Sequence, residues 1–365
     1  MNTLNTMNRP KVFIPIIFLF AVIIVAGWIF FSNENMGDLE KAYLIPPVEQ
    51  QTKERIWKEI DFKQIAISDN LYSVTSMQFG EDGLLYFGDR EEMIVRSFDL
   101  SANPVNSFGN GKGNGPGEFA RFFDAIHLDK ENNIWIYDSS NSRLTIINSS
   151  TKSQVIHQTD EVSFFLIPLD SGSYASDHHQ YASTDIYTAN HEKTGSFEAL
   201  VRNPELWNII FQGAVAIHND FSVIKTFYFT NNIARFSSNG DLIYFRKSVN
   251  HVETNKIVSE YQVYENGGPG YTFADFSSFE QLTSAIGLSE NHIHLLISVD
   301  EEFNFETEEF ESTLLFDTYD IDTGDYLYSY NTPESVTNFA VSETHLAGIS
   351  EEYGRLIIWE TLEGW

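Results

Sequence analysis

Short runs of alternating hydrophobic and polar residues dominate the chain from residue 57 onward. Residues 125–147, for example, contain three such runs, which are rich in Ile, Leu, Trp and Tyr and are separated by polar turns. A period of two residues with β-branched and aromatic side chains predicts β-strands. No long helical period appears in this region, so the pattern favours a β-sandwich, a β-barrel or a β-propeller.

Internal repetition distinguishes these three architectures. Gly83 and Asn133 occupy the same turn position fifty residues apart, where a positive φ is tolerated. The last two units nearly superpose with an offset of 53 residues. Six units are recognised, around residues 79–100, 128–148, 164–176, 214–245, 288–298 and 341–350. A four-stranded unit of roughly 40–50 residues is typical of a propeller blade, so the sequence predicts an all-β, six-bladed β-propeller.

Closure of the predicted ring depends on two segments that are far apart in the sequence. The last unit ends with RLIIWETL at residues 355–362 and lacks a fourth strand. Residues 60–67, IDFKQIAI, precede the first unit and have no partner of their own. We expect residues 60–67 to pair beside residues 356–359 as the outer strand of the final blade. This pairing would remove the open edge between the first and last blades.

The second unit carries a family resemblance. Residues 108–148 contain a glycine-rich connector that ends in GPGEF, followed by three alternating strands separated by polar turns. This segment resembles an NHL-type repeat, the unit of many six-bladed β-propellers, here of a membrane-anchored bacterial type. The resemblance covers one repeat closely and the rest of the chain loosely.

The resemblance implies roles for three residues and two kinds of function. Asp138, Asn141 and Arg143 match the turn in which such residues hold the hairpin by side-chain to backbone hydrogen bonds; Arg143 alternatively lines a face and meets an anion. NHL-type domains bind proteins or glycans more often than they perform chemistry. Six-bladed relatives also include calcium-dependent lactonases and lyases.

The amino-terminal region contains a twenty-residue stretch without a charge, VFIPIIFLFAVIIVAGWIFF at residues 12–31. As a helix rising about 1.5 Å per residue, it would span roughly 30 Å, the thickness of a bilayer core. Arg9 and Lys11 precede it and acidic residues follow it, which predicts a cytoplasmic amino terminus and a periplasmic or extracellular propeller. The alternative is a cleaved signal peptide, which usually has a shorter apolar core and a small-x-small cleavage site.

The predicted organisation therefore has four parts. A polar tether, with one or two helical turns, joins the transmembrane anchor to the propeller. The cytoplasmic segment, anchor, tether and propeller are placed at residues 1–11, 12–31, 32–56 and 57–365.

The net charge of −30 and the absence of cysteine exclude several functions. A strongly negative surface repels nucleic-acid backbones and anionic lipid headgroups, so no nucleic-acid partner is expected. Without cysteine there is no disulfide, thiolate metal site, cysteine nucleophile or lipobox-type anchor. The charge fits either a solvated acidic surface or a cationic partner.

Glycine-rich and acidic motifs are interpreted as structural. Five glycines within residues 109–117 match neither G-x-G-x-x-G nor G-x-x-x-x-G-K-[ST], and a strand follows them instead of a helix. We interpret them as a flexible connector between blades, and residues 267–270 in the same way. Asp320, Asp322 and Asp325 lack the glycine and glutamate positions of an EF-hand, which favours a hairpin turn.

Histidines are the remaining candidates for a metal site. His292 and His294 alternate on one face of a predicted strand and could share a metal ion, but no third ligand is identifiable nearby. Ser176-Asp177-His178-His179 is the other histidine group. We assign no catalytic, cofactor-binding or metal-binding residue, and no G-x-S-x-G or H-E-x-x-H motif occurs.

An acidic insertion at residues 300–311, DEEFNFETEEFE, intersperses Phe with Glu and predicts a long hairpin. Its three phenylalanines, Phe303, Phe305 and Phe310, either pack over neighbouring blades or are exposed as an interaction surface.

Together these features predict a membrane-tethered binding or scaffolding module outside the cytoplasm, with a protein or glycan as partner. Propellers gather the loops of their blades at one mouth of the central channel, where ligands usually bind. The alternative is a calcium-dependent hydrolase or lyase with its site at that mouth. A purely structural envelope component is a third hypothesis.

Overall fold

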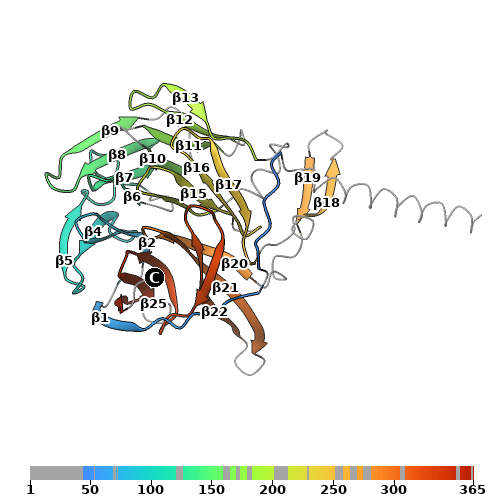
Figure 1. Ribbon diagram of the computed structural model, residues 1–365. Coiled ribbons are helices and arrows are strands. Elements are labelled where there is room, and N and C mark those ends of the chain that lie inside the picture. Colours follow the sequence, from blue (N-terminus) through green and yellow to red (C-terminus); the bar gives the residue numbers. More distant parts are fainter. Residues whose placement is uncertain are drawn as a thin grey trace, which may run out of the picture.

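The computed structural model describes residues 44–365 except 53, 69–70, 72, 121–125, 159–164, 170–172, 179–182, 201–212, 228–229, 251–257, 264–268, 274–280, 305–308, 351–353 and 363–364. The described residues form six four-stranded antiparallel sheets, arranged as the blades of a propeller (Figure 1). The described part of the chain contains no helix. The predicted all-β, six-bladed fold is therefore confirmed.

Strands follow one another from the channel outward in the first five blades. Blade 1 contains β2 (Val74–Phe79), β3 (Leu85–Asp89), β4 (Ile94–Phe98) and β5 (Pro104–Phe108). Blade 2 contains β6 (Ile126–Leu128), β7 (Asn133–Asp138), β8 (Arg143–Asn148) and β9 (Gln154–Gln158). Blade 3 contains β10 (Phe165–Pro168), β11 (Tyr174–His178), β12 (Ser183–Tyr187) and β13 (Lys193–Ser196).

The second half of the ring repeats this order. Blade 4 contains β14 (Val215–Ile217), β15 (Val223–Thr226), β16 (Asn232–Phe236) and β17 (Leu242–Lys247). Blade 5 contains β20 (Gln281–Leu288), β21 (His292–Asn304), β22 (Glu309–Asp320) and β23 (Tyr326–Tyr330). Blade 6 contains β24 (Val336–Val341), β25 (His345–Ser350), β26 (Leu356–Thr361) and, as its outer strand, β1 (Phe62–Ser68).

Blade 6 is thus completed by a strand from the other end of the folded region. β1 pairs antiparallel with β26, from Phe62 opposite Thr361 to Ser68 opposite Leu356. The predicted closure is confirmed. It joins the first and last parts of the ring through backbone hydrogen bonds and removes the exposed edge of β26.

The hydrophobic core lies between adjacent blades. In β26, Ile357 and Trp359 pack with residues of blade 5, whereas Leu356 and Ile358 pack with residues of blade 1. Successive side chains of a strand point to opposite faces, and both faces of this blade are covered by its neighbours. The first four residues of β26, Leu356–Trp359, therefore form an uninterrupted hydrophobic run rather than an alternating one.

The segment before β1, residues 44–58, lies along the outside of blades 4 and 5, and we call it the strap (Figure 1). Val48 forms a parallel bridge with Arg246 of β17, and Trp57 forms one with Ser329 of β23. The sequence predicts a tether with helical turns here. The described residues of that tether, 44–52 and 54–56, contain no helix and instead form hydrogen bonds with the propeller.

Gln50 anchors the strap between two blades. Its Nε2 donates to the carbonyl oxygens of Lys247 in blade 4 and Gly324 in blade 5, at 2.8 and 2.9 Å. Its Oε1 accepts a hydrogen bond of 2.8 Å from the backbone N–H of Tyr326. The side chain is only 9% exposed, so these three bonds replace those it would make with water.

The glycine-rich segment connects β5 to β6, as predicted, but it is hydrogen-bonded instead of flexible. Gly109, Gly111 and Gly117 have φ of +97°, +87° and +72°, which other residues rarely adopt. The loop folds back on itself, because the N–H of Asn110 donates to the Gly117 carbonyl at 2.6 Å and the N–H of Phe119 to that of Gly111 at 2.9 Å.

Two further sequence interpretations concern the region around blade 5. A separate two-stranded sheet, β18 (Val258–Val263) and β19 (Pro269–Phe273), lies between blades 4 and 5 in the chain. Residues 269–270, interpreted as a connector, begin β19 instead, while 267–268 lie outside the described residues. The predicted acidic hairpin at 300–311 is confirmed by the pairing of β21 with β22, although its phenylalanine side chains are outside the described set.

The predicted transmembrane segment at residues 12–31 lies outside the described residues, as do all of residues 1–43. Among the residues that the structure describes, no helix is long and apolar enough to cross a membrane.

Candidate functional site

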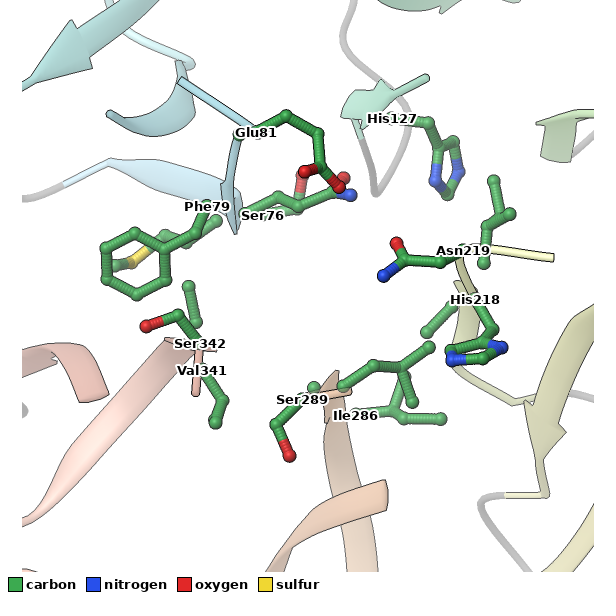
Figure 2. A pocket seen from close by; sticks show the side chains of 18 of the residues that line it. Ser76, Phe79, Glu81, His127, His218, Asn219, Ile286, Ser289, Val341 and Ser342 are labelled. Atoms are coloured by element: carbon green, nitrogen blue, oxygen red, sulfur yellow. The ribbon is translucent and has the colours of Figure 1, made fainter. Parts of the chain in front are cut away.

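A cavity of about 500 Å³ opens at one end of the central channel. The inner strands β2, β6, β14, β20 and β24 supply its wall, and the turns that follow most of these strands supply its rim. Figure 2 shows side chains from these blades around an open space, including Glu81, His127, Asn219 and Ser342. Ligand pockets commonly measure about 300–1,000 Å³, so this mouth has room for a small ligand or a few side chains.

Side chains of β2 hold the wall together where blades 1 and 2 meet. Ser76 Oγ accepts a hydrogen bond of 2.7 Å from the backbone N–H of Ile126, and Gln78 Oε1 accepts one of 3.1 Å from Leu128. An inner strand has no strand neighbour on its channel side, so its backbone donors need such partners. These bonds fix the spacing of two inner strands along the cavity.

The rim turns are also linked from blade to blade. Asn132 of blade 2 accepts a hydrogen bond of 2.8 Å from the N–H of Glu81 in blade 1. His218 of blade 4 contacts the carbonyl of Glu290 in blade 5 at 3.1 Å. Glu343 of blade 6 accepts a hydrogen bond of 2.7 Å from the N–H of Glu290. The rim is therefore held in a defined arrangement.

Acidic side chains that line the mouth differ from the neighbouring Asp220, which does not line the cavity. The carboxylate of Asp220 forms an ion pair within the protein, because Arg235 Nη2 lies 2.7 Å from it. Burial alone would raise the pKa of Asp220, but hydrogen bonds from Ser222 and His218 and the charge of Arg235 hold it below its usual value. By contrast, the exposed carboxylate of Glu81 makes no ion pair or hydrogen bond with any described residue.

His127 is the most buried titratable group in the wall among the described residues. It is 8% exposed and makes no hydrogen bond with any described residue. Figure 2 shows its ring beside the open space. Burial lowers the pKa of His127 to about 4, so the imidazole is neutral at pH 7.

The neutral state of His127 predicts an acid-sensitive contribution to stability. The unfolded chain protonates His127 near its ordinary pKa of 6.5, and the folded chain only near 4, so unfolding takes up a proton between these values. Stability from this group is complete above pH 6.5 and is lost as the pH falls to 4, by on the order of 3 kcal/mol. Urea unfolding of wild type and His127→Gln between pH 7 and 4 should show a shallower loss in the variant. Equal slopes would contradict the prediction.

Phe221 borders a smaller side cavity of about 60 Å³ next to the mouth. Its φ of +61° is unusual for an aromatic residue and indicates a backbone held in place by its surroundings. The ammonium group of Lys130 in blade 2 lies 4.8 Å from the centre of the Phe221 ring. This contact joins blades 2 and 4 at the mouth and directs Lys130 towards an aromatic ring.

The residues of the NHL-like turn are structural, as the resemblance implies. Asp138 is fully buried and accepts hydrogen bonds from the N–H of Ala120 and from Asn141 Nδ2, at 2.8 and 2.7 Å. Arg143 donates to the carbonyl oxygens of three residues of the glycine-rich segment, Asn114, Gly115 and Glu118. Its guanidinium also lies 3.7 Å from the carboxylate of Asp138, so it is used within the protein.

The acidic triplet of the β22–β23 turn forms a hairpin, as predicted. Asp320 Oδ1 accepts hydrogen bonds from the N–H groups of Asp322 and Thr323, at 3.1 and 2.8 Å. The carboxylates of Asp322 and Asp325 pair with Arg235 and Arg246 of blade 4, respectively. Each of the three carboxylates therefore contacts a different partner within the protein.

The predicted face shared by His292 and His294 is confirmed, with ring centroids 6.1 Å apart. His294 is fully buried and contacts the hydroxyls of Ser289 and Tyr330 at 3.3 and 3.2 Å. Burial lowers the pKa of both histidines. Within the described part of the chain, no three His, Asp or Glu side chains come together as a metal site. The side chains of Asp177, His178 and His179 lie outside the described set.

The residues that line the mouth are not among those predicted from the sequence. A signal was present, because the last two units carry Ser-Glu at the same position, Ser289-Glu290 and Ser342-Glu343, and the first unit has Gly80-Glu81. In the structure these positions follow the inner strands of blades 5, 6 and 1. Repetition at a turn was interpreted only as evidence for the fold.

Comparisons with known proteins support the fold. No protein-family model matches the sequence, and the search of curated proteins gave no significant match. Among solved structures, a member of the DUF4221 family from Bacteroides vulgatus aligns over 84% of this chain and 98% of its own, with 10% identity and a TM-score of 0.55. A putative exported protein from Bacteroides fragilis aligns over 86% of this chain and 98% of its own, with 11% identity and a TM-score of 0.53. At this identity the likeness shows the fold alone.

Proposed function

We propose that this chain is a membrane-anchored β-propeller with NHL-like repeats that binds a protein or glycan partner outside the cytoplasm through its channel mouth. The observation that carries the proposal is the 500 Å³ mouth, whose rim and wall combine carboxylates, imidazoles, amides and hydroxyls from five blades. Such a mixture of polar groups around a concave, largely pre-formed site is typical of ligand binding.

The proposed location rests on the amino-terminal sequence. Residues 12–31 are long enough to span a bilayer, and Arg9 and Lys11 favour a cytoplasmic amino terminus. The Bacteroides fragilis protein that shares the fold is a putative exported protein. In this proposal the anchor at residues 12–31 precedes the strap, which leads into the propeller.

The location can be tested with single cysteines, because the chain has none of its own. In cells with an intact cytoplasmic membrane, a membrane-impermeant maleimide should label Ser101→Cys, which is exposed in blade 1. It should label Asn5→Cys only after lysis. Labelling of both, or of Asn5→Cys alone, would contradict the proposed orientation.

The binding role can be tested with the same chemistry. A photo-crosslinker attached to Asn219→Cys, at the exposed rim, should give a discrete adduct in native membranes. The matched control is Ser101→Cys, which is also exposed but lies outside the cavity lining. Adducts of the same pattern from both positions, or none from Asn219→Cys, would count against a ligand at the mouth.

A further inference from the structure

We propose that the channel mouth binds a basic side chain, arginine or lysine, from an exposed segment of a protein partner. Glu81, Glu290 and Glu343 supply the negative charge, and His127 supplies a hydrogen bond. The inference rests on the proposed function, because it names the chemistry of the partner at the same mouth.

The three glutamates are placed by the repeat of the fold. Each is exposed, and each lies in the turn after the inner strand of its blade, in the neighbouring blades 5, 6 and 1. All three line the same cavity. The carboxylates of Glu81 and Glu290 make no ion pair or hydrogen bond with the described residues. They are therefore available to a ligand, unlike Asp220, which is paired with Arg235.

No positive charge offsets these carboxylates at the mouth. Among the described residues that line the 500 Å³ cavity, none is Lys or Arg. The adjacent Lys130 is directed at the ring of Phe221. Carboxylates gathered at one opening repel one another, and a bound cation relieves this repulsion. The chain's net charge of −30 adds a long-range field that accelerates the approach of a cationic partner.

His127 provides the second, independent observation. The imidazole is 8% exposed, lines the cavity and has no hydrogen-bond partner among the described residues, so its ring nitrogens are available to a ligand. In Figure 2 it faces the space that Glu81 faces from blade 1. Because the ring is neutral at pH 7, it does not repel a cation, and its unprotonated nitrogen can accept an N–H from a guanidinium or ammonium group.

The dimensions favour a side chain over a bare metal ion. The glutamates are distributed over three turns, and the described residues contain no group of three metal-ligating side chains. A mouth of 500 Å³ accommodates an arginine or lysine with its flanking backbone.

The test uses the purified full-length chain and a fluorescent arginine–glycine–serine peptide, with a glutamate–glycine–serine peptide as its counterpart. Saturable binding of the arginine peptide alone is expected. The variant Glu81→Gln/Glu290→Gln/Glu343→Gln should bind it about tenfold or more weakly, because three charges near the ligand are lost. His127→Leu, which keeps all three glutamates, should weaken binding about threefold to tenfold through the lost hydrogen bond.

A matched control removes the same charge elsewhere. Glu59, Glu91 and Glu192 are exposed and do not line the cavity, so Glu59→Gln/Glu91→Gln/Glu192→Gln should change affinity less than about threefold. Equal losses in the two triple variants would mean non-specific attraction and would overturn the inference. If the mouth triple variant unfolds, Glu290→Gln alone provides the comparison.

The remaining outcomes separate this inference from the proposed function. An adduct from Asn219→Cys without binding of the arginine peptide would overturn the basic-ligand inference and leave the binding role standing. Saturable binding of a neutral oligosaccharide that is unaffected by the glutamate changes would assign the mouth to a glycan instead. Absence of both the adduct and peptide binding would overturn the function as well.

Discussion

Replacement of β1 (Phe62–Ser68) by an equally long glycine–serine segment is expected to abolish the single cooperative unfolding transition of the propeller. β26 would lose its hydrogen-bonded neighbour, and the edge of blade 6 would be exposed. Phe62 would leave an aromatic cluster in which its ring centroid lies 6.4 Å from that of Trp359 and 6.2 Å from that of Trp365. Losses of several kcal/mol are comparable with a total stability of about 5–15 kcal/mol.

Thermal unfolding followed by circular dichroism would measure this effect. The matched control is the same replacement of β9 (Gln154–Gln158), an outer strand that is similarly exposed but does not close the ring. The control should keep a cooperative transition at a lower midpoint, because all six blades remain joined to their neighbours. A β1 variant that melts as cooperatively as the β9 control would show that ring closure does not depend on this strand.

The architecture could be predicted because a blade is local in sequence. Strands of one blade are joined by short turns, so each blade leaves a similar pattern of short hydrophobic strands and polar turns in the sequence. This pattern recurs along the chain up to the hydrophobic run of β26. Closure could also be predicted, since an incomplete last unit and an unpaired first segment complement each other. The last unit has one strand too few, and the segment before the first unit is one strand too many. This long-range pairing is therefore also visible in the sequence.

The strap could not be predicted in the same way. Its contacts use backbone groups, the polar side chains of Glu49, Gln50 and Arg55, and the packing of Ile45, and they leave no hydrophobic period in the sequence. A polar segment with two prolines has the composition of a linker, and composition alone does not distinguish a free linker from one that is hydrogen-bonded to a surface. The partners of Gln50 lie about two hundred residues further along the chain or beyond.

The residues at the channel mouth could be predicted from the sequence only in part. The glutamates after the inner strands repeat visibly, but their convergence depends on the radial arrangement of blades 5, 6 and 1. The burial of His127 could not be predicted, for a different reason. It stands in a three-residue strand between Ile126 and Leu128, where alternation predicts an exposed polar residue. Its burial at the channel wall follows from the neighbouring blades, which the alternation does not reveal.

Substitution of Arg55 by alanine is expected to destabilise the propeller by about 3 kcal/mol, because it leaves the buried carboxylate of Asp317 without its counter-charge. Arg55 Nε lies 3.3 Å from Asp317 Oδ1, and the Asp317 side chain is fully buried. Asn250 and Ser329 also donate hydrogen bonds to this carboxylate. These neutral donors remain in the variant but do not replace the lost charge.

The pH dependence distinguishes this mechanism from a simple loss of packing. Burial raises the pKa of Asp317, and the charge of Arg55 offsets part of that effect. Without Arg55 the folded-state pKa rises further, so the folded chain holds the proton more tightly than the unfolded chain. The deficit of Arg55→Ala relative to wild type should therefore be small near pH 4 and grow as the pH rises through the new folded-state pKa.

Urea unfolding of the full chain at a series of pH values would measure the deficit. The double variant Arg55→Ala/Asp317→Asn should be more stable at pH 7 than Arg55→Ala, because it buries no unpaired charge. Lys63→Ala breaks an exposed pair with Glu360 and should cost less than about 1 kcal/mol. A deficit that is the same at pH 4 and pH 7, or a double variant no more stable than Arg55→Ala, would show that the strap is held by packing and backbone hydrogen bonds instead of by this buried ion pair.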